Sequence, residues 1–267
     1  MRDFRYGIRM LARNPFFAAA AILCAALGTG VTTAIFSVVN AVLLRPLPYA
    51  RAGRLVRVFS EFPKEVSGAS QGGFKHFWIS PPEYFELKRD LGSFDAVEAW
   101  VNGTSNIAGQ DEPLRVTASF VTGGLLDTRG VQPMIGRFLT PADDDPNAPT
   151  NAVLSYDLWQ RAFARDPRIL GRDIRLNGAA CTVVGVMPGG FNFPPGIQNP
   201  SELWTPVGLD PANPGPWGRH FLSVLARLRP GVALAQAQSE VTRYAVHPAA
   251  RSRAPNIALI RWSIRWC

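Results

Sequence analysis

The chain has 267 residues, 47% of them hydrophobic and only 18% charged, and this composition excludes an intrinsically disordered protein. It is long enough for one sizeable domain or two small ones. Its three cysteines are far apart and form no Cys-x-x-Cys pair, which excludes a disulfide framework and the common zinc-finger spacings.

The net charge of +8 is unevenly distributed along the chain. Residues 1–57 contain eight arginines and one acidic residue, and residues 241–267 contain five arginines and no acidic residue. Residues 58–240 carry fifteen basic and nineteen acidic residues, a net charge of −4. A DNA-binding domain needs its basic stripe on the folded body, so nucleic acid is not an expected partner.

Residues 1–15 predict an amphipathic helix at a membrane surface. Phe4, Ile8 and Leu11 recur at helical spacing, and four arginines occupy positions around them. The apolar face would rest on lipid while the arginines remain in water.

Residues 16–44 contain no Asp, Glu, Lys, Arg or His. This uncharged run exceeds the roughly 20 residues that cross a bilayer, so the sequence predicts one transmembrane helix here. Small residues such as Ala26 and Gly30 allow close approach of another transmembrane helix, although glycine is common in such helices in any case. Arginines flank both ends, and charge alone leaves the orientation open.

Residues 45–240 predict a mixed α+β domain, because helical and strand patterns interleave and one pair of strands forms a hairpin. Ser80 and Glu83 have the spacing of a helix capping box, and Asn177-Gly178 predicts a type I′ turn. A polar, proline-bounded stretch suggests two lobes joined near residue 145. In chain order we expect strands at 55–60, 97–101, 114–121, 151–155, 174–176, 181–186 and 224–228; helices at 80–88, 156–165 and 232–244; a turn or short helix at 122–128; and proline-rich loops at 188–216.

No motif assigns a catalytic, cofactor-binding or metal-binding residue. The chain has no phosphate-binding GxxxxGK[ST] loop, no GxSxG and no HExxH. His76, His220 and His247 are isolated from one another, and Asp143–Asp145 between two prolines predicts a solvated turn rather than a calcium loop. Enzymatic activity and ATP hydrolysis by the chain alone are therefore not expected.

Several stretches carry a recognisable pattern in order and spacing: FRYGIRMLARNPFF (4–17), ALGTGVTTAIFSVVNAVLLRPLPY (26–49), ISPPEYFELKRDLGSFDAVEAW (79–100) and LARLRPGVALAQAQSE (225–240). With them the sequence resembles MacB-like, FtsX-type ABC transporter permeases of the acidobacterial, duplicated orphan kind. The resemblance covers residues 1–240 almost continuously and includes the Asn-Gly hairpin.

The resemblance implies a cytoplasmic N-terminus, a first transmembrane helix and a MacB-like periplasmic core domain outside the cell (inner) membrane. It also implies a non-catalytic subunit that works in export or efflux with a cytoplasmic ABC-type ATPase, and with further transmembrane helices or a second permease copy. Residues 241–267 depart from the family pattern as an atypical basic tail, so we expect a truncated or frameshifted fragment. The alternative is a single-span extracytoplasmic binding or adaptor module that transports nothing.

Overall fold

The computed structural model describes residues 15–39, 52–62, 74–108, 113–128, 130–194, 199–245 and 261–266. The chain divides into two compact units, Met1–Pro48 and Tyr49–Cys267. Each unit has its own secondary structure, and all strands among the described residues lie in the second.

The first unit contains helix α2, Pro15–Val39, which has 25 residues. Thr29, Thr32 and Thr33 each donate a hydroxyl hydrogen bond to a carbonyl one turn earlier in the helix. None of the helices in the described parts of the chain combines the length and the hydropathy needed to cross a bilayer. The structure thus does not confirm the span predicted over 16–44, and residues 1–14 of the predicted amphipathic helix lie outside the described residues.

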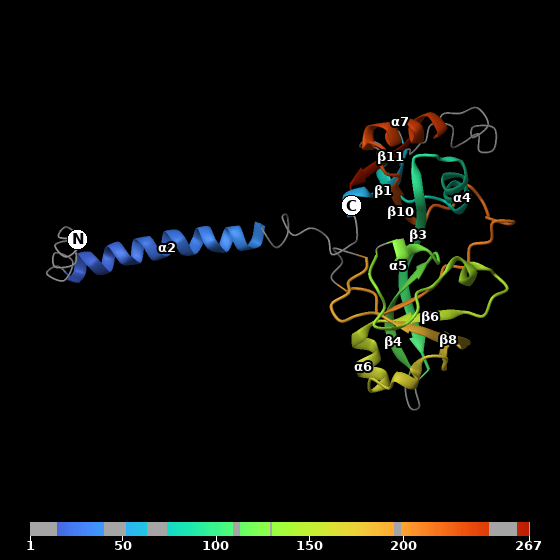
Figure 1. Cartoon of the computed structure of the whole chain (residues 1–267), viewed down its shortest axis with the longest axis horizontal. Coiled ribbons are helices and arrows are strands. Elements are labelled where there is room, and N and C mark those ends of the chain that lie inside the picture. The colour runs from blue at the N-terminus through green and yellow to red at the C-terminus, as the bar shows by residue number, and fades with distance from the viewer. Residues whose placement is uncertain are drawn as a thin grey trace. The chain divides into compact units, whose positions relative to one another are not determined.

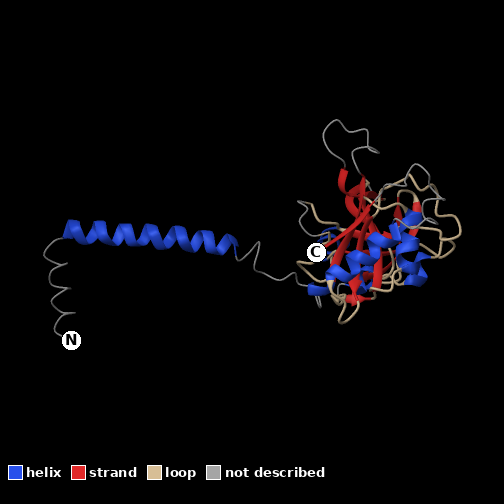
Figure 2. Cartoon of the chain, turned by 90° about the horizontal axis from the view of Figure 1, so that it is seen from above, coloured by secondary structure: helices blue, strands red, loops and turns tan. Residues whose placement is uncertain are grey.

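The second unit, the body, is a mixed α+β domain, as predicted, and is shown in Figure 1. Figure 2 distinguishes its helices and strands by colour. The α-helices are α4 (Pro81–Asp90), α5 (Leu125–Thr128), α6 (Tyr156–Phe163) and α7 (Leu234–Ala245), and 3-10 turns cover Ala52–Arg54, Pro141–Asp144 and Pro167–Ile169. The strands are β1 (Leu55–Phe62), β2 (Phe74–Phe77), β3 (Phe94–Ile107), β4 (Leu114–Val121), β5 (Ile135–Gly136), β6 (Asn151–Leu154), β7 (Asp173–Leu176), β8 (Ala179–Val186), β9 (Leu203–Pro206), β10 (Ser223–Leu228) and β11 (Arg261–Trp266).

The strands form one sheet in the order β11-β1-β10-β3-β4-β9-β6-β8-β5, with β2 beside β1, and β7 beside β3 and β8. The pairs β4–β9 and β6–β8 are parallel, and the other pairs are antiparallel. This mixture is what the hairpin among interleaved helices predicted.

Local sequence signals account for several elements. The capping box predicted at the start of α4 is present, because the Ser80 backbone N–H and hydroxyl both donate to Glu83 Oε2, at 2.7 and 2.8 Å. The turn between β7 and β8 has positive φ angles of 51° at Asn177 and 88° at Gly178, as a type I′ turn requires. Both predictions are confirmed.

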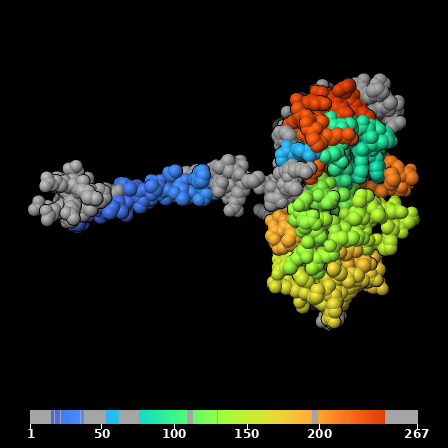
Figure 3. Space-filling view, in the orientation of Figure 1, coloured from blue at the N-terminus to red at the C-terminus, as the bar shows by residue number. Residues whose placement is uncertain are grey.

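The body has two hydrophobic clusters. The first cluster contains buried residues of β1, α4, the first half of β3, β10 and α7. The second cluster contains buried residues of the end of β3, β4, β6, α6, β7, β8 and β9. In Figure 3, α4 and α7 lie at one end of the body and the green and yellow segments of the second cluster at the other.

The division between the clusters crosses β3 rather than residue 145. Val116 and Leu154 lie on either side of residue 145 in the sequence, and both belong to the second cluster. The predicted junction is therefore wrong, because the polar stretch is a turn within one cluster. Strand β3 runs through both clusters, with Val97 in the first and Ile107 in the second.

Other segments also differ from the prediction, among them strands β2 and β5, which were not expected. Strand β9 lies within the stretch predicted as proline-rich loops, and its pairing with β4 and β6 explains why it is a strand. β3 has 14 residues rather than five, since the partners β10, β4 and β7 extend it. In the predicted basic tail, α7 continues to Ala245, and Arg261–Trp266 pairs with β1.

Candidate functional site

Buried ionisable side chains connect secondary-structure elements in the described part of the body at three places. Each such polar contact is called a joint and is named after its central carboxylate: the Glu83, Asp143 and Glu98 joints. The described residues contain no group of three or more His, Cys, Asp or Glu side chains that could hold a metal ion. His76 is exposed on β2 with its ring 4.9 Å from that of Phe59, and His247 lies outside the described residues.

The Glu83 joint lies in the first cluster. His220 Nε2 is 3.1 Å from Glu83 Oε2, and the two side chains are only 5% and 3% exposed. Ser80 donates to the same carboxylate, and the Ser60 hydroxyl is 3.5 Å from its other oxygen. A serine-type catalytic triad needs the imidazole between hydroxyl and carboxylate, whereas here the carboxylate lies between the other groups. The arrangement therefore suits a buried connection between α4, β1 and the segment before β10.

The pKa of His220 is raised above its ordinary value. Burial by itself lowers this pKa, but the hydrogen bond and the negative charge of Glu83 favour the protonated imidazole more strongly. Protonation thus strengthens the joint.

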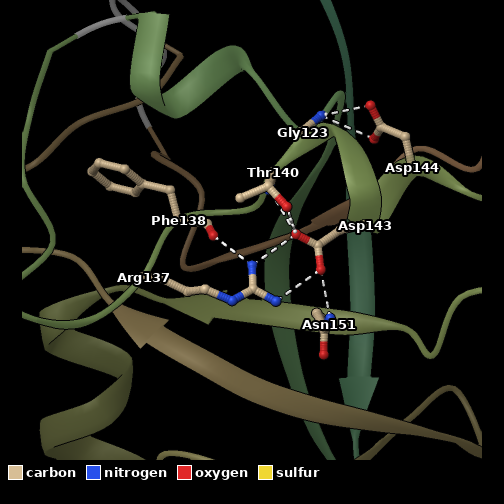
Figure 4. A network of polar contacts seen from close by, with 7 residues as sticks. All are labelled: Gly123, Arg137, Phe138, Thr140, Asp143, Asp144 and Asn151. Carbon is tan, nitrogen blue, oxygen red and sulfur yellow. Dashed lines mark hydrogen bonds and ion pairs between the residues drawn. The ribbon is translucent and has the colours of Figure 1, made fainter.

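The Asp143 joint, in Figure 4, fixes the turn before β6. Arg137 donates to both oxygens of Asp143, at 2.8 and 3.0 Å, and the Thr140 N–H and Asn151 side chain donate at 2.6 Å each. Arg137 also donates to the Phe138 carbonyl at 2.8 Å. Asp143 is 6% exposed, so the prediction of a solvated turn is wrong for this residue. Five donated hydrogen bonds, including one from the Thr140 hydroxyl, replace the water that burial removes.

Burial alone raises the pKa of Asp143, yet the result is a pKa well below its usual range. The donors on Arg137, Thr140 and Asn151 stabilise the ionised carboxylate more than burial destabilises it. Asp143 is therefore a permanently charged anchor at neutral pH.

The neighbouring Asp144 binds a different turn. The backbone N–H of Gly123 donates to both of its carboxylate oxygens at 2.9 Å (Figure 4). A Cβ atom on Gly123 would lie 1.9 Å from the Thr140 carbonyl oxygen, so only glycine permits this approach. Burial raises the pKa of Asp144 above its ordinary value.

The Glu98 joint lies on β3 between Val97 and Ala99, which both belong to the first cluster. Glu98 is 6% exposed; the Thr122 hydroxyl donates to it, and Lys88 Nζ is 3.8 Å away. Lys88 also donates to the Tyr84 hydroxyl at 3.0 Å. A Cβ on Gly124 would lie 2.4 Å from the Glu98 carboxylate, so Gly123 and Gly124 bring both acidic joints against one turn. Burial is the main cause of the raised pKa of Glu98, and Lys88 opposes it only in part.

Two surface cavities of the body are lined by both polar and apolar side chains. One of about 400 Å³ lies against β3 and β4 and includes Val101, Phe120, Phe221 and Arg219. Another of about 310 Å³ is lined by polar groups that include Ser155, with an Arg161–Glu202 ion pair of 2.7 Å at its wall. Neither contains one of the three joints.

One of these joints could have been found in the sequence. Thr140-Pro-Ala-Asp143 has the capping-box spacing recognised at Ser80, and the structure shows the same reciprocal bonds. Arg137, Asn151 and the Glu98–Lys88 contact depend on tertiary packing and leave no local signal.

The body is thus a domain of the α+β class, with a mixed sheet in which buried ionisable groups connect strands and turns. The chain belongs to a particular family of such domains, the MacB-like periplasmic core domain, whose family model matches residues 18–244. The recognition made from the sequence motifs is confirmed. A comparison with curated proteins finds no match.

Solved structures share the fold. A permease-protein domain from Porphyromonas gingivalis is 15% identical with a TM-score of 0.58, over 82% of this chain and 93% of that one. The extracellular domain of the noncanonic ABC-type transporter YknZ from Gram-positive bacteria is 14% identical with a TM-score of 0.55, over 79% and 99%. The periplasmic region of MacB from Actinobacillus actinomycetemcomitans is 14% identical with a TM-score of 0.55, over 80% and 89%. At these identities the likeness establishes the fold.

Proposed function

We propose that the chain is a non-catalytic, permease-type subunit of a MacB/FtsX-like ABC transporter. The family match over residues 18–244 carries this proposal. The subunit couples a partner ATPase in the cytoplasm to the body outside the membrane, in export or efflux. The three joints support this role, because a body that transmits movement needs its strands and turns held together.

The proposed placement has residues 1–15 in the cytoplasm, residues 16–44 in the inner membrane and residues 45–240 outside it. The uncharged run supports the membrane span, and the family match over residues 18–244 supports the orientation, which charge alone leaves open. A reporter that is active only in the cytoplasm should be silent when fused after Glu240 and active when fused before Met1. Activity at Glu240 would contradict the orientation.

The ATPase must come from a partner, since the sequence has no phosphate-binding loop. The partner should contact residues 2–13, the cytoplasmic segment of the proposal. Replacing Phe4, Ile8 and Leu11 with Ser removes the predicted apolar face and should reduce stimulation of a co-purified ATPase at least tenfold. Tyr6→Ser is the matched control, because Tyr6 lies off that face at helical spacing.

A membrane-anchored adaptor module is the second candidate. The body forms a compact unit by itself, as a binding module would. If the body captures a partner protein while no ATPase co-purifies with the full chain, the adaptor is favoured. ATP turnover by the isolated chain, abolished by a mutation within it, would refute both candidates.

A further inference from the structure

Strand β1 has two edges with different partners. Val56 pairs with both Ala226 of β10 and Trp266 of β11, and Ser60 pairs with both Phe77 of β2 and Trp262 of β11. Because a strand residue has one neighbour on each side, β10 and β2 share one edge, and β11 takes the other.

The β11 edge is a discrete addition to the family core. The matched region ends at residue 244, whereas β11 covers Arg261–Trp266. Within the described part of the chain, β11 is the terminal strand of the sheet order and pairs only with β1. Without β11, β1 would be an edge strand with a row of open backbone N–H and C=O groups, which readily accept another strand.

We propose that this edge of β1, over Val56–Glu61, is a strand-acceptor site, and that residues 261–266 of a second copy of this chain are its partner in trans. The chain's own β11 demonstrates the fit, with six consecutive antiparallel register pairs from Val56↔Trp266 to Glu61↔Arg261. The same segment of an identical chain can make the same main-chain pairing. This inference does not rest on the transport role, although strand exchange between copies in one membrane rests on the proposed membrane placement.

The length of the connection between α7 and β11 determines the protein concentration at which two copies exchange β11. Fifteen residues, 246–260, join the two elements, and fully extended they reach at most about 50 Å. Such a tether holds β11 at an effective concentration on the order of millimolar, so the chain's own strand wins in dilute solution. Two copies held side by side, as in one membrane, reach comparable local concentrations and can exchange strands.

The test uses the full chain in detergent with two single variants, Ser263→Pro and Ile264→Pro. Adjacent residues of an edge strand direct their N–H groups alternately toward and away from the neighbouring strand. One variant therefore removes a hydrogen bond to β1, and the other is its matched control. The probe is a labelled peptide with the sequence of residues 261–266.

We expect the disrupting variant to bind the peptide at least tenfold more tightly than the wild-type chain and the control variant do. Hydrogen exchange of those amides in Val56–Glu61 that point toward β11, every second residue of this stretch, should be fast in that variant and slow again with peptide. An unchanged thermal transition establishes that the variant is folded. Failure of both folded variants to bind peptide better than wild type, or unchanged protection of these amides in both, would overturn the acceptor site.

The second-copy partner has its own readout. Adding unlabelled wild-type chain at millimolar concentration, where a strand from a second copy competes with the chain's own strand, should restore protection of the β11-facing amides of Val56–Glu61 and produce a mixed dimer by mass. If the peptide restores protection and the wild-type chain does not at concentrations up to millimolar, the second copy is refuted as the partner.

Discussion

The carboxylates of Asp143 and Glu98 are buried to the same extent, 6% exposed each, yet their pKa values are shifted in opposite directions. Asp143 receives five hydrogen bonds, two of them from Arg137, and its pKa falls. Glu98 has the Thr122 hydroxyl and an ammonium group at 3.8 Å, and its pKa rises. Burial alone does not decide the charge of a carboxylate; the number and distance of its donors do.

A substitution in the turn that both joints share should have the largest effect on the stability of the body. Gly123→Ala would place a Cβ 1.9 Å from the Thr140 carbonyl oxygen, so the backbone must move away. We expect a loss of about 3 kcal/mol in the free energy of unfolding, measured by urea denaturation. Gly189→Ala is the control, since its nearest contact would be an ordinary 3.7 Å to the Tyr156 ring. Equal stability of the two variants would contradict the close packing of this turn.

Asp143→Asn tests the lowered pKa directly. It should cost about 2 kcal/mol at neutral pH, because the charge-assisted bonds to Arg137 are lost. A carboxyl group with a lowered folded pKa stabilises the protein above its unfolded pKa, near 3.8, and loses this contribution as the pH falls through the folded value. The difference between wild type and variant should thus shrink below about pH 4. Asp145→Asn, at an exposed neighbour, is the control.

Glu98→Gln should behave in the opposite way. A carboxyl group with a raised folded pKa destabilises the protein as the pH rises from the ordinary glutamate value, 4.5, through the folded value. The variant has no carboxyl group to ionise, so its stability relative to wild type should increase over this interval, by about 1.4 kcal/mol for every tenfold difference between the folded and unfolded acid dissociation constants. Parallel unfolding curves across pH 4 to 8 would show that Glu98 is not destabilised by burial.

His220→Gln extends the comparison to a side chain that is positively charged when protonated. We expect this substitution to have the smallest effect on the free energy of unfolding. The raised pKa means that protonated His220 adds stability below its ordinary pKa of 6.5, and that this contribution is lost as the pH rises through the folded value. Unfolding measured at pH 5.5 should show a loss of about 1 kcal/mol that decreases at high pH. The exposed His76→Gln is the control; a pH-independent loss at His220 would indicate packing alone.

Much of the fold could be predicted because it is written in local patterns. The capping box at Ser80 and the Asn177-Gly178 turn depend on neighbours in sequence, and both are present. Strand β9 has four residues between proline-rich loops, and its strand state depends on β4 and β6. No local pattern carries that information.

The joints were less accessible to sequence reasoning for the same physical reason. Glu98 and Lys88 are ten positions apart on different elements, and Glu83 and His220 are much farther apart in the sequence. A single sequence shows the charges but not which of them folding brings together. Asp143 is an exception. The spacing from Thr140 to Asp143 is that of a helix capping box, whereas the three adjacent aspartates suggested a solvent-exposed turn.

Strand β3 is the long strand that both hydrophobic clusters of the body share. Its first half pairs with β10 up to Trp100 and its second half with β4 from Trp100 onward, so one uninterrupted backbone of about 45 Å passes through both clusters. A pull along this strand loads both rows of backbone hydrogen bonds in shear. Because the same backbone is bonded to β10 at one end and to β4 at the other, drawing the two clusters apart along β3 would require breaking one of these rows.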